Sequence, residues 1–65
     1  MVVNRETKIG DILDFNRDTA VYFLEMGMHC LGCPSARNET IEQACRVHGV
    51  SGDDLSARIN EHLSK

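Results

Sequence analysis

Apolar residues recur along this chain at spacings of three and four residues, which is the period of an amphipathic helix. The first group predicts a helix that Thr7 caps and that breaks at Asn16; its apolar residues are Ile9, Ile12 and Leu13. Asp18 is expected to cap a second helix, because its side-chain oxygen can accept hydrogen bonds from free backbone N–H groups. The apolar residues of this second helix are Val21, Phe23 and Leu24.

Glycine is expected to end two of the helices, because it adopts the left-handed conformation without a Cβ clash. Gly27 is placed to end the second helix, so that Met28 and Phe23 become the pair that meets in a Schellman ending. Gly49 predicts the same kind of ending for the third helix. The loop that carries the chain onward from the second helix therefore begins near Met28.

The second half of the chain predicts two further helices. The third runs from about Glu39 to His48, and Ile41, Ala44, Cys45 and His48 fall on one face of it. The fourth begins after Ser51, with Asp54 three residues later as an approximate capping box. Its buried face is formed by Leu55, Ile59 and Leu63.

The predicted fold class is all-α: a compact bundle of four short helices, with the loop that holds Cys30 and Cys33 between the second and third. A length of 65 residues indicates a single domain spanning residues 1–65, with its core in about 7–63. A chain this short buries only about 60% of the surface that its unfolded form exposes. We therefore expect function to depend on one or two surface loops, or on a partner.

Charge and hydropathy argue against two classes of function, nucleic-acid binding and membrane insertion. The formal net charge is −3, and the arginines are scattered along the chain rather than clustered. Nucleic-acid binding, which requires a basic patch, is therefore not expected. No apolar run approaches the roughly 20 residues that a membrane span requires, and no signal segment precedes the first charges. We expect a cytoplasmic protein.

The loop from Met28 to Pro34 carries the chemistry of the chain. Cys30 and Cys33 are separated by two residues, and Gly32 makes a turn between them easy, so their sulfurs can reach bonding distance. In the cytosol this spacing indicates redox or metal chemistry rather than a structural disulfide framework. His29 lies next to Cys30 and can add a positive charge when protonated.

Pro34 suits the first position of a further short helix, here Pro34 to about Arg37, because proline has no N–H to leave unsatisfied. Cys33 then becomes the residue that precedes the helix. Free N–H groups and the positive end of a helix stabilise a thiolate, which is the nucleophilic form of cysteine. Two inert, buried cysteines are the simpler interpretation, but a glycine-containing loop at a helix start favours reactivity.

Two motifs resemble a known family. The run Gly-Met-His-Cys-Leu-Gly-Cys-Pro-Ser-Ala at 27–36, followed by the segments 39–44 and 47–50, is similar to small helical domains associated with hybrid-cluster (prismane) proteins. The resemblance extends over 7–63. It implies an all-helical fold in which Cys30 and Cys33 form a redox disulfide, in a family without an established activity. Cys45 departs from the family, which has a small apolar residue such as alanine there, so no role of Cys45 is inherited.

A metal site is the strongest alternative. The ligands would be Cys30, Cys33, Cys45 and His48, because three thiolates and an imidazole form an acceptable tetrahedral zinc shell. Zinc binding would also stabilise a small chain by coupling to folding. Against this, Cys45 lies on the face that the third helix should bury, where it is expected to pack on Val50. A core cysteine is the favoured interpretation.

Other metal functions fit less well. The sequence Gly-Met-x-Cys-x-x-Cys also occurs in copper-binding domains, and two thiolates suit Cu(I). Those domains need alternating β-strands after the motif, whereas this chain has a helical period there. An iron–sulfur cluster ordinarily takes four cysteines, and this chain has 3. Met26 and Met28 are expected to fill gaps in the core rather than bind a soft metal.

The function predicted from the sequence is therefore thiol–disulfide exchange through Cys30 and Cys33, without a cofactor, with a redox partner protein or a small thiol. We expect an accessory domain rather than a self-sufficient enzyme. A protein-interaction module, in which the loop only shapes a docking surface, is the alternative of a different class. The sequence leaves the partner, the direction of electron flow and the oligomeric state open, a homo-oligomer included.

Overall fold

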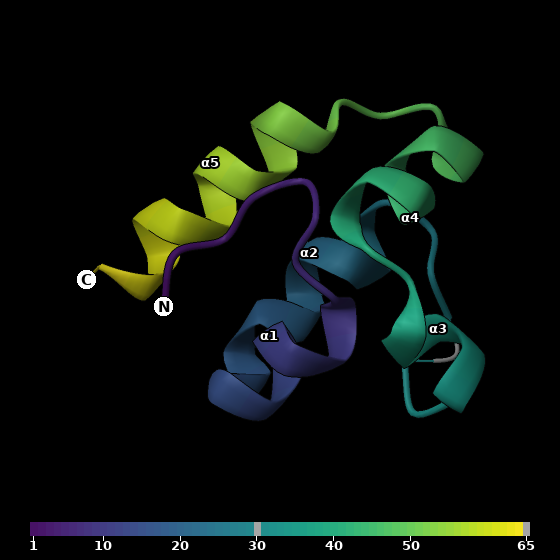
Figure 1. Ribbon diagram of the computed structural model, residues 1–65, viewed down its shortest axis with the longest axis horizontal. Helices are drawn as coiled ribbons and strands as arrows, with labels where there is room; N and C mark the ends of the chain where they lie inside the picture. The colour runs from purple at the N-terminus through teal and green to yellow at the C-terminus, as the bar shows by residue number, and fades with distance from the viewer. Residues whose placement is uncertain (30, 65) are drawn as a thin grey trace.

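The computed structural model describes residues 1–29 and 31–64, and helices account for most of them (Figure 1). The helices are α1 (Ile9–Phe15), the short 3-10 helix η1 (Arg17–Thr19), α2 (Ala20–Glu25), α3 (Pro34–Asn38), α4 (Ile41–His48) and α5 (Gly52–Leu63). Within the described residues, β-structure is confined to an isolated bridge between Lys8 and Thr40. The all-helical prediction is confirmed. The predicted short helix after Cys33 makes a fifth α-helix beside the four longer segments.

The starts of the first two helices differ from the prediction. Thr7 does not cap α1: its hydroxyl accepts a hydrogen bond from the backbone N–H of Asn4 at 3.0 Å, so it closes the turn before the helix. Asp18 does not cap α2: it lies inside η1, and its own N–H donates to the side chain of Asn16, the cap of η1, at 2.9 Å. That cap starts η1, and α2 follows it at Ala20.

The glycine endings are as predicted. Gly27 has a φ of 107°, and the Met28 N–H donates to the Phe23 carbonyl oxygen at 3.1 Å. Gly49 has a φ of 70°, and the N–H of Val50 donates to the Cys45 carbonyl oxygen at 2.9 Å. Both are the long hydrogen bond of a Schellman motif. The first of them sets the direction in which the chain leaves α2.

The start of α4 is held by the N-terminal segment of the chain. The Ile41 N–H donates to the Thr7 carbonyl oxygen at 3.0 Å, and the Glu42 N–H donates to the Arg5 carbonyl oxygen at 2.9 Å. The side chain of Thr40 completes the start as the first half of a capping box. Because the free N–H groups of the first turn are thereby satisfied, α4 begins at Ile41 rather than near Glu39.

One apolar core joins the helices. Its fully or largely buried members are Val3, Ile9, Ile12, Leu13, Phe23, Met28, Ile41, Ala44, Cys45, Leu55 and Ile59. Of the apolar residues that define α2, Phe23 is buried, whereas Val21 and Leu24 remain about half exposed. Leu63 is partly buried against the same core. The α1 helix packs on α3, and α4 packs on α5.

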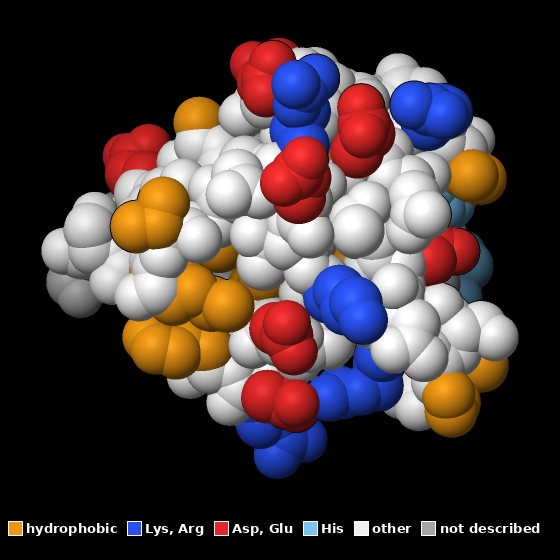
Figure 2. Space-filling view, viewed as in Figure 1, with side chains coloured by type: hydrophobic (Ala, Val, Ile, Leu, Met, Phe, Trp, Pro, Cys, Tyr) orange, Lys and Arg blue, Asp and Glu red, His pale blue; other side chains and the backbone are white. Residues whose placement is uncertain are grey.

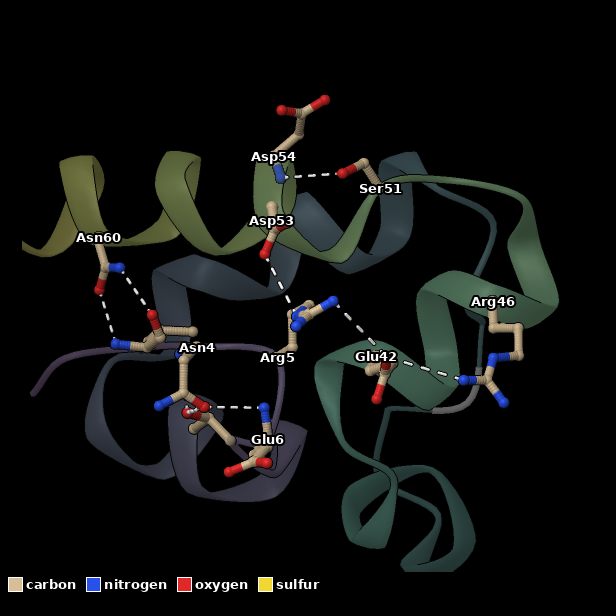
Figure 3. Close-up of polar contacts among 11 residues, drawn as sticks. Asn4, Arg5, Glu6, Glu42, Arg46, Ser51, Asp53, Asp54 and Asn60 are labelled. Atoms are coloured by element: carbon tan, nitrogen blue, oxygen red, sulfur yellow. Dashed lines mark hydrogen bonds and ion pairs between the residues drawn. The ribbon is translucent and has the colours of Figure 1, made fainter.

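The last helix is attached to the beginning of the chain by polar contacts (Figure 3). The Asn60 side-chain amide accepts from the Val3 N–H at 2.7 Å and donates to the Val3 carbonyl oxygen at 2.8 Å, so it satisfies both backbone groups of Val3. Arg5 lies between Asp53 of α5, at 3.4 Å, and Glu42 of α4, at 3.9 Å. These contacts bring the N-terminal segment and the end of α5 to the same side of the molecule (Figure 1).

The surface carries mixed charge. Figure 2 shows acidic and basic side chains interspersed over the visible face, with several basic side chains beside acidic ones toward its lower edge. The predicted pair of Glu42 and Arg46 forms along α4 at 3.7 Å. In the part of the chain that the structure describes, no helix is long and apolar enough to cross a membrane.

Candidate functional site

Cys33 stands at the start of α3, as predicted. It has extended backbone angles, with φ −76° and ψ 132°, and Pro34 follows as the first helical residue. Its carbonyl oxygen accepts the N–H of Arg37 at 3.0 Å, which closes the first turn of α3. The side chain of Cys33 is exposed. The expected contact between its sulfur and the free N–H groups of the helix is not seen, because the thiol makes no capping hydrogen bond to a residue that the structure describes.

Cys30, the other member of the predicted pair, lies outside the described residues. The proposed bond between Cys30 and Cys33 therefore stays a prediction. The two residues between these cysteines are described: Leu31 is half-buried against the core, and Gly32 is exposed. Leu31 thus anchors the motif to the body of the protein.

A close contact between backbones fixes α3 against α1. A Cβ atom on Gly10 would lie 2.9 Å from the carbonyl oxygen of Arg37. The Arg37 guanidinium reaches back to α1, donating to the Gly10 carbonyl oxygen at 3.4 Å and to the Asp14 carboxylate at 2.6 Å. Glycine is required here because only a residue without a side chain lets the two backbones approach so closely. These contacts hold α3 against α1 near the last turn of α3, at Arg37.

Cys45 has a different environment. It is only 1% exposed, on the inner face of α4, and burial raises the pKa of its thiol above the ordinary value. Desolvation disfavours the charged form, so this thiol stays protonated and unreactive in the folded protein. The predicted role of Cys45 as a core residue is confirmed.

The residues proposed for the zinc alternative are divided between the core and the surface. Cys45 is buried, whereas Cys33 and His48 are exposed. The His48 ring lies over the start of the motif loop, with Nδ1 3.4 Å from where a Cβ on Gly27 would stand. Among residues 1–29 and 31–64, no group of three or more His, Cys, Asp or Glu side chains is placed to hold a metal ion.

The methionines near the loop have the packing role that the sequence predicted. Met28 is buried in the core, and Met26 is half-buried against it. Both side chains are therefore used to fill space between α2 and its neighbours, which is the common role of methionine in irregular cores.

A cavity of about 450 Å³ lies beside the motif, and we call it the motif cavity. It is lined by Leu13, Asp14, Arg17, Ala20, Leu31, Gly32 and Arg37. Its walls come from α1, from η1 and the start of α2, from the motif itself, and from Arg37 of α3. The sequence analysis did not predict that Arg17 and Arg37 line a common cavity, because the arginines are scattered along the chain.

Two comparisons with known proteins gave a match, one to a family and one to a solved structure. Residues 3–55 match the family described as "Domain of unknown function (DUF1858)". The chain belongs to the DUF1858 family. The NMR solution structure of a protein from Clostridium thermocellum is 45% identical in sequence and has a TM-score of 0.82, covering 98% of this chain and 91% of that one. The comparison with curated proteins gave no match.

The DUF1858 match includes both predicted site cysteines and the glycines that end α2 and α4. It ends at Leu55, within α5. The remaining part of α5 is the part that Asn60 attaches to Val3.

Proposed function

We propose that this DUF1858 domain exchanges thiols and disulfides through Cys30 and Cys33, as an accessory to a redox partner rather than as a self-sufficient enzyme. No cofactor is needed for this chemistry. The cytosol is the proposed compartment, because a Cys-x-x-Cys pair there stays available for reversible exchange. Association with hybrid-cluster proteins is the finer proposal that the motif resemblance supports.

The observation that carries the proposal is the contrast between the described cysteines. Cys33 is exposed at the start of α3, whereas Cys45 is buried with a raised pKa. Exchange requires an accessible thiol with thiolate character, so Cys33 meets the first requirement and Cys45 meets neither. The close approach of Gly10 to Arg37 holds α3, which follows Cys33, against α1.

Oxidation kinetics test this proposal. Reduced protein is mixed with 2-hydroxyethyl disulfide, and the loss of free thiols is followed by mass spectrometry after acid quenching. We expect rapid loss of two thiols in the wild type and in Cys45→Ala, which removes the buried sulfur alone. Cys30→Ser and Cys33→Ser should stop at a mixed disulfide, because each lacks the second thiol that resolves it. Equal oxidation of all three single variants would refute the proposal.

A protein-interaction module is the second candidate, favoured by apolar side chains that the fold leaves outside the core. Val47 is 77% exposed on α4, and Val21 and Leu24 are about half exposed on α2. The double variant Cys30→Ser/Cys33→Ser distinguishes the two functions once a partner is known. Unchanged partner binding by that variant would favour the interaction module, and lost binding would favour a mixed disulfide with the partner.

A further inference from the structure

We propose that the motif cavity binds a low-molecular-weight thiol that carries carboxylate groups, in its thiol or disulfide form. This proposal rests on the redox function and names the class of substrate for it. Leu31 and Gly32, the two residues between the reactive cysteines, form part of the cavity wall. A molecule seated in the cavity therefore contacts the two residues that separate the cysteines.

The charges that line the motif cavity favour an anion. Arg17 and Arg37 supply two positive charges, and Asp14 supplies one negative charge. Asp14 pairs with Arg37 at 2.6 Å, whereas Arg17 makes no ion pair with any residue that the structure describes. The lining is thus positive by one charge on a chain whose net charge is −3. Guanidinium groups bind carboxylates through two parallel hydrogen bonds, which suits Arg17 to this role.

The remaining wall is apolar. Leu13 of α1, Ala20 of α2 and Leu31 of the motif face the cavity. A volume of about 450 Å³ lies in the range of small-molecule sites, which combine apolar walls with a few polar groups that fix orientation. A thiol of tripeptide size, with a short apolar backbone and terminal carboxylates, matches both the walls and the charges.

The exchange reaction is balanced with a disulfide RSSR as the oxidant. One protein thiolate attacks a sulfur of RSSR, forming a mixed disulfide and releasing RS⁻. The second protein thiolate attacks the protein sulfur of the mixed disulfide, forming the bond between Cys30 and Cys33 and releasing the second RS⁻. Two protein thiols are oxidised, RSSR is reduced to two thiols, and the two protons pass to the released thiolates. Arg17 holds a carboxylate of R and acts only in positioning.

The kinetic test uses three disulfides that differ in charge: glutathione disulfide, the neutral 2-hydroxyethyl disulfide and the cationic cystamine. Each rate is compared with the rate of the wild type for the same disulfide, which removes differences in intrinsic reactivity. Arg17→Gln should slow oxidation by glutathione disulfide about two- to fivefold, the range for one exposed ion pair. It should leave the neutral disulfide unchanged and should not slow cystamine. Arg46→Gln is the control, because it removes another exposed arginine, on α4 and outside the cavity.

A binding test separates the site from the redox chemistry. S-methylglutathione cannot exchange, and it is added to ¹⁵N-labelled protein while amide signals are recorded. We expect shifts at Leu31 and Gly32 in the wild type and in Arg46→Gln, and smaller shifts in Arg17→Gln. If exchange proceeds but Arg17→Gln slows all three disulfides equally and these amides do not move, the cavity proposal is overturned and the redox function stands. Shifts without any exchange would leave the binding site supported and the redox function refuted.

Discussion

Replacing Gly10 by alanine tests how the motif is supported. The new Cβ would lie 2.9 Å from the carbonyl oxygen of Arg37 and 3.0 Å from its Cβ. The obstructing atom is backbone, so α1 and α3 must separate rather than a side chain rotate. Overpacking of this kind costs about 1–3 kcal/mol. Alanine gains up to about 1 kcal/mol over glycine within a helix, which offsets part of this cost.

The expected result for Gly10→Ala is a net loss of about 1 kcal/mol in the free energy of unfolding. For a domain of this size that loss lowers Tm by roughly 4–8 °C. Urea and thermal unfolding, followed by circular dichroism, measure both quantities. Gly32→Ala is the control, because its Cβ position has no atom within 4 Å among the described residues beyond its chain neighbours, and its φ is not positive. A Gly10→Ala protein as stable as the wild type would refute the close approach of α3 to α1.

Three further predictions concern the core and the last helix. Asn60→Ala should lower the free energy of unfolding by about 1–3 kcal/mol, because it leaves both backbone groups of Val3 without their partner; faster amide exchange at Val3 would confirm the cause, and unchanged exchange would contradict it. Ser56→Ala should be neutral or stabilise by up to about 1 kcal/mol in urea unfolding, since the buried hydroxyl has no hydrogen-bond partner among the described residues; a clear loss of stability would reveal a partner. Burial raises the pKa of the Cys45 thiol in the folded protein. The stabilisation from burying the neutral thiol is therefore complete at pH values below the pKa of this thiol in the unfolded chain, and it is lost as the pH rises through its higher pKa in the folded protein. The difference in unfolding free energy between the wild type and Cys45→Ala should therefore fall at alkaline pH, and a difference that grew with pH would show that the thiol is not desolvated.

Local signals in the sequence predicted the helix endings better than the helix starts. Gly27 and Gly49 were recognisable because glycine is strongly preferred where φ is positive. Asn16, Asp18 and Thr7 are all competent caps by residue type, and the sequence gives no direct indication of which side chain faces the free N–H groups. The prediction chose Asp18 and Thr7, whereas Asn16 caps η1 and the Lys8 backbone begins α1.

Contacts between distant segments were beyond sequence reasoning. Asn60 and Val3 are 57 positions apart, and neither residue type indicates such a pairing. The approach of Gly10 to Arg37 appears only once α1 and α3 are packed together. The motif cavity is of the same kind, because it gathers residues from three separate segments. By contrast, Cys45 was predictable as a core residue, since its helical period alone places it on the buried face of α4.

The most direct test of the redox proposal is intact-mass analysis of the reduced and the mildly oxidised protein, with peptide mapping and metal content measured on the same samples. The proposal predicts an oxidised form that lacks two hydrogen atoms, a single linkage between Cys30 and Cys33, a free Cys45, and less than about half an equivalent of zinc in folded protein. A linkage that includes Cys45, or stoichiometric zinc whose removal by a chelator unfolds the chain, would contradict it.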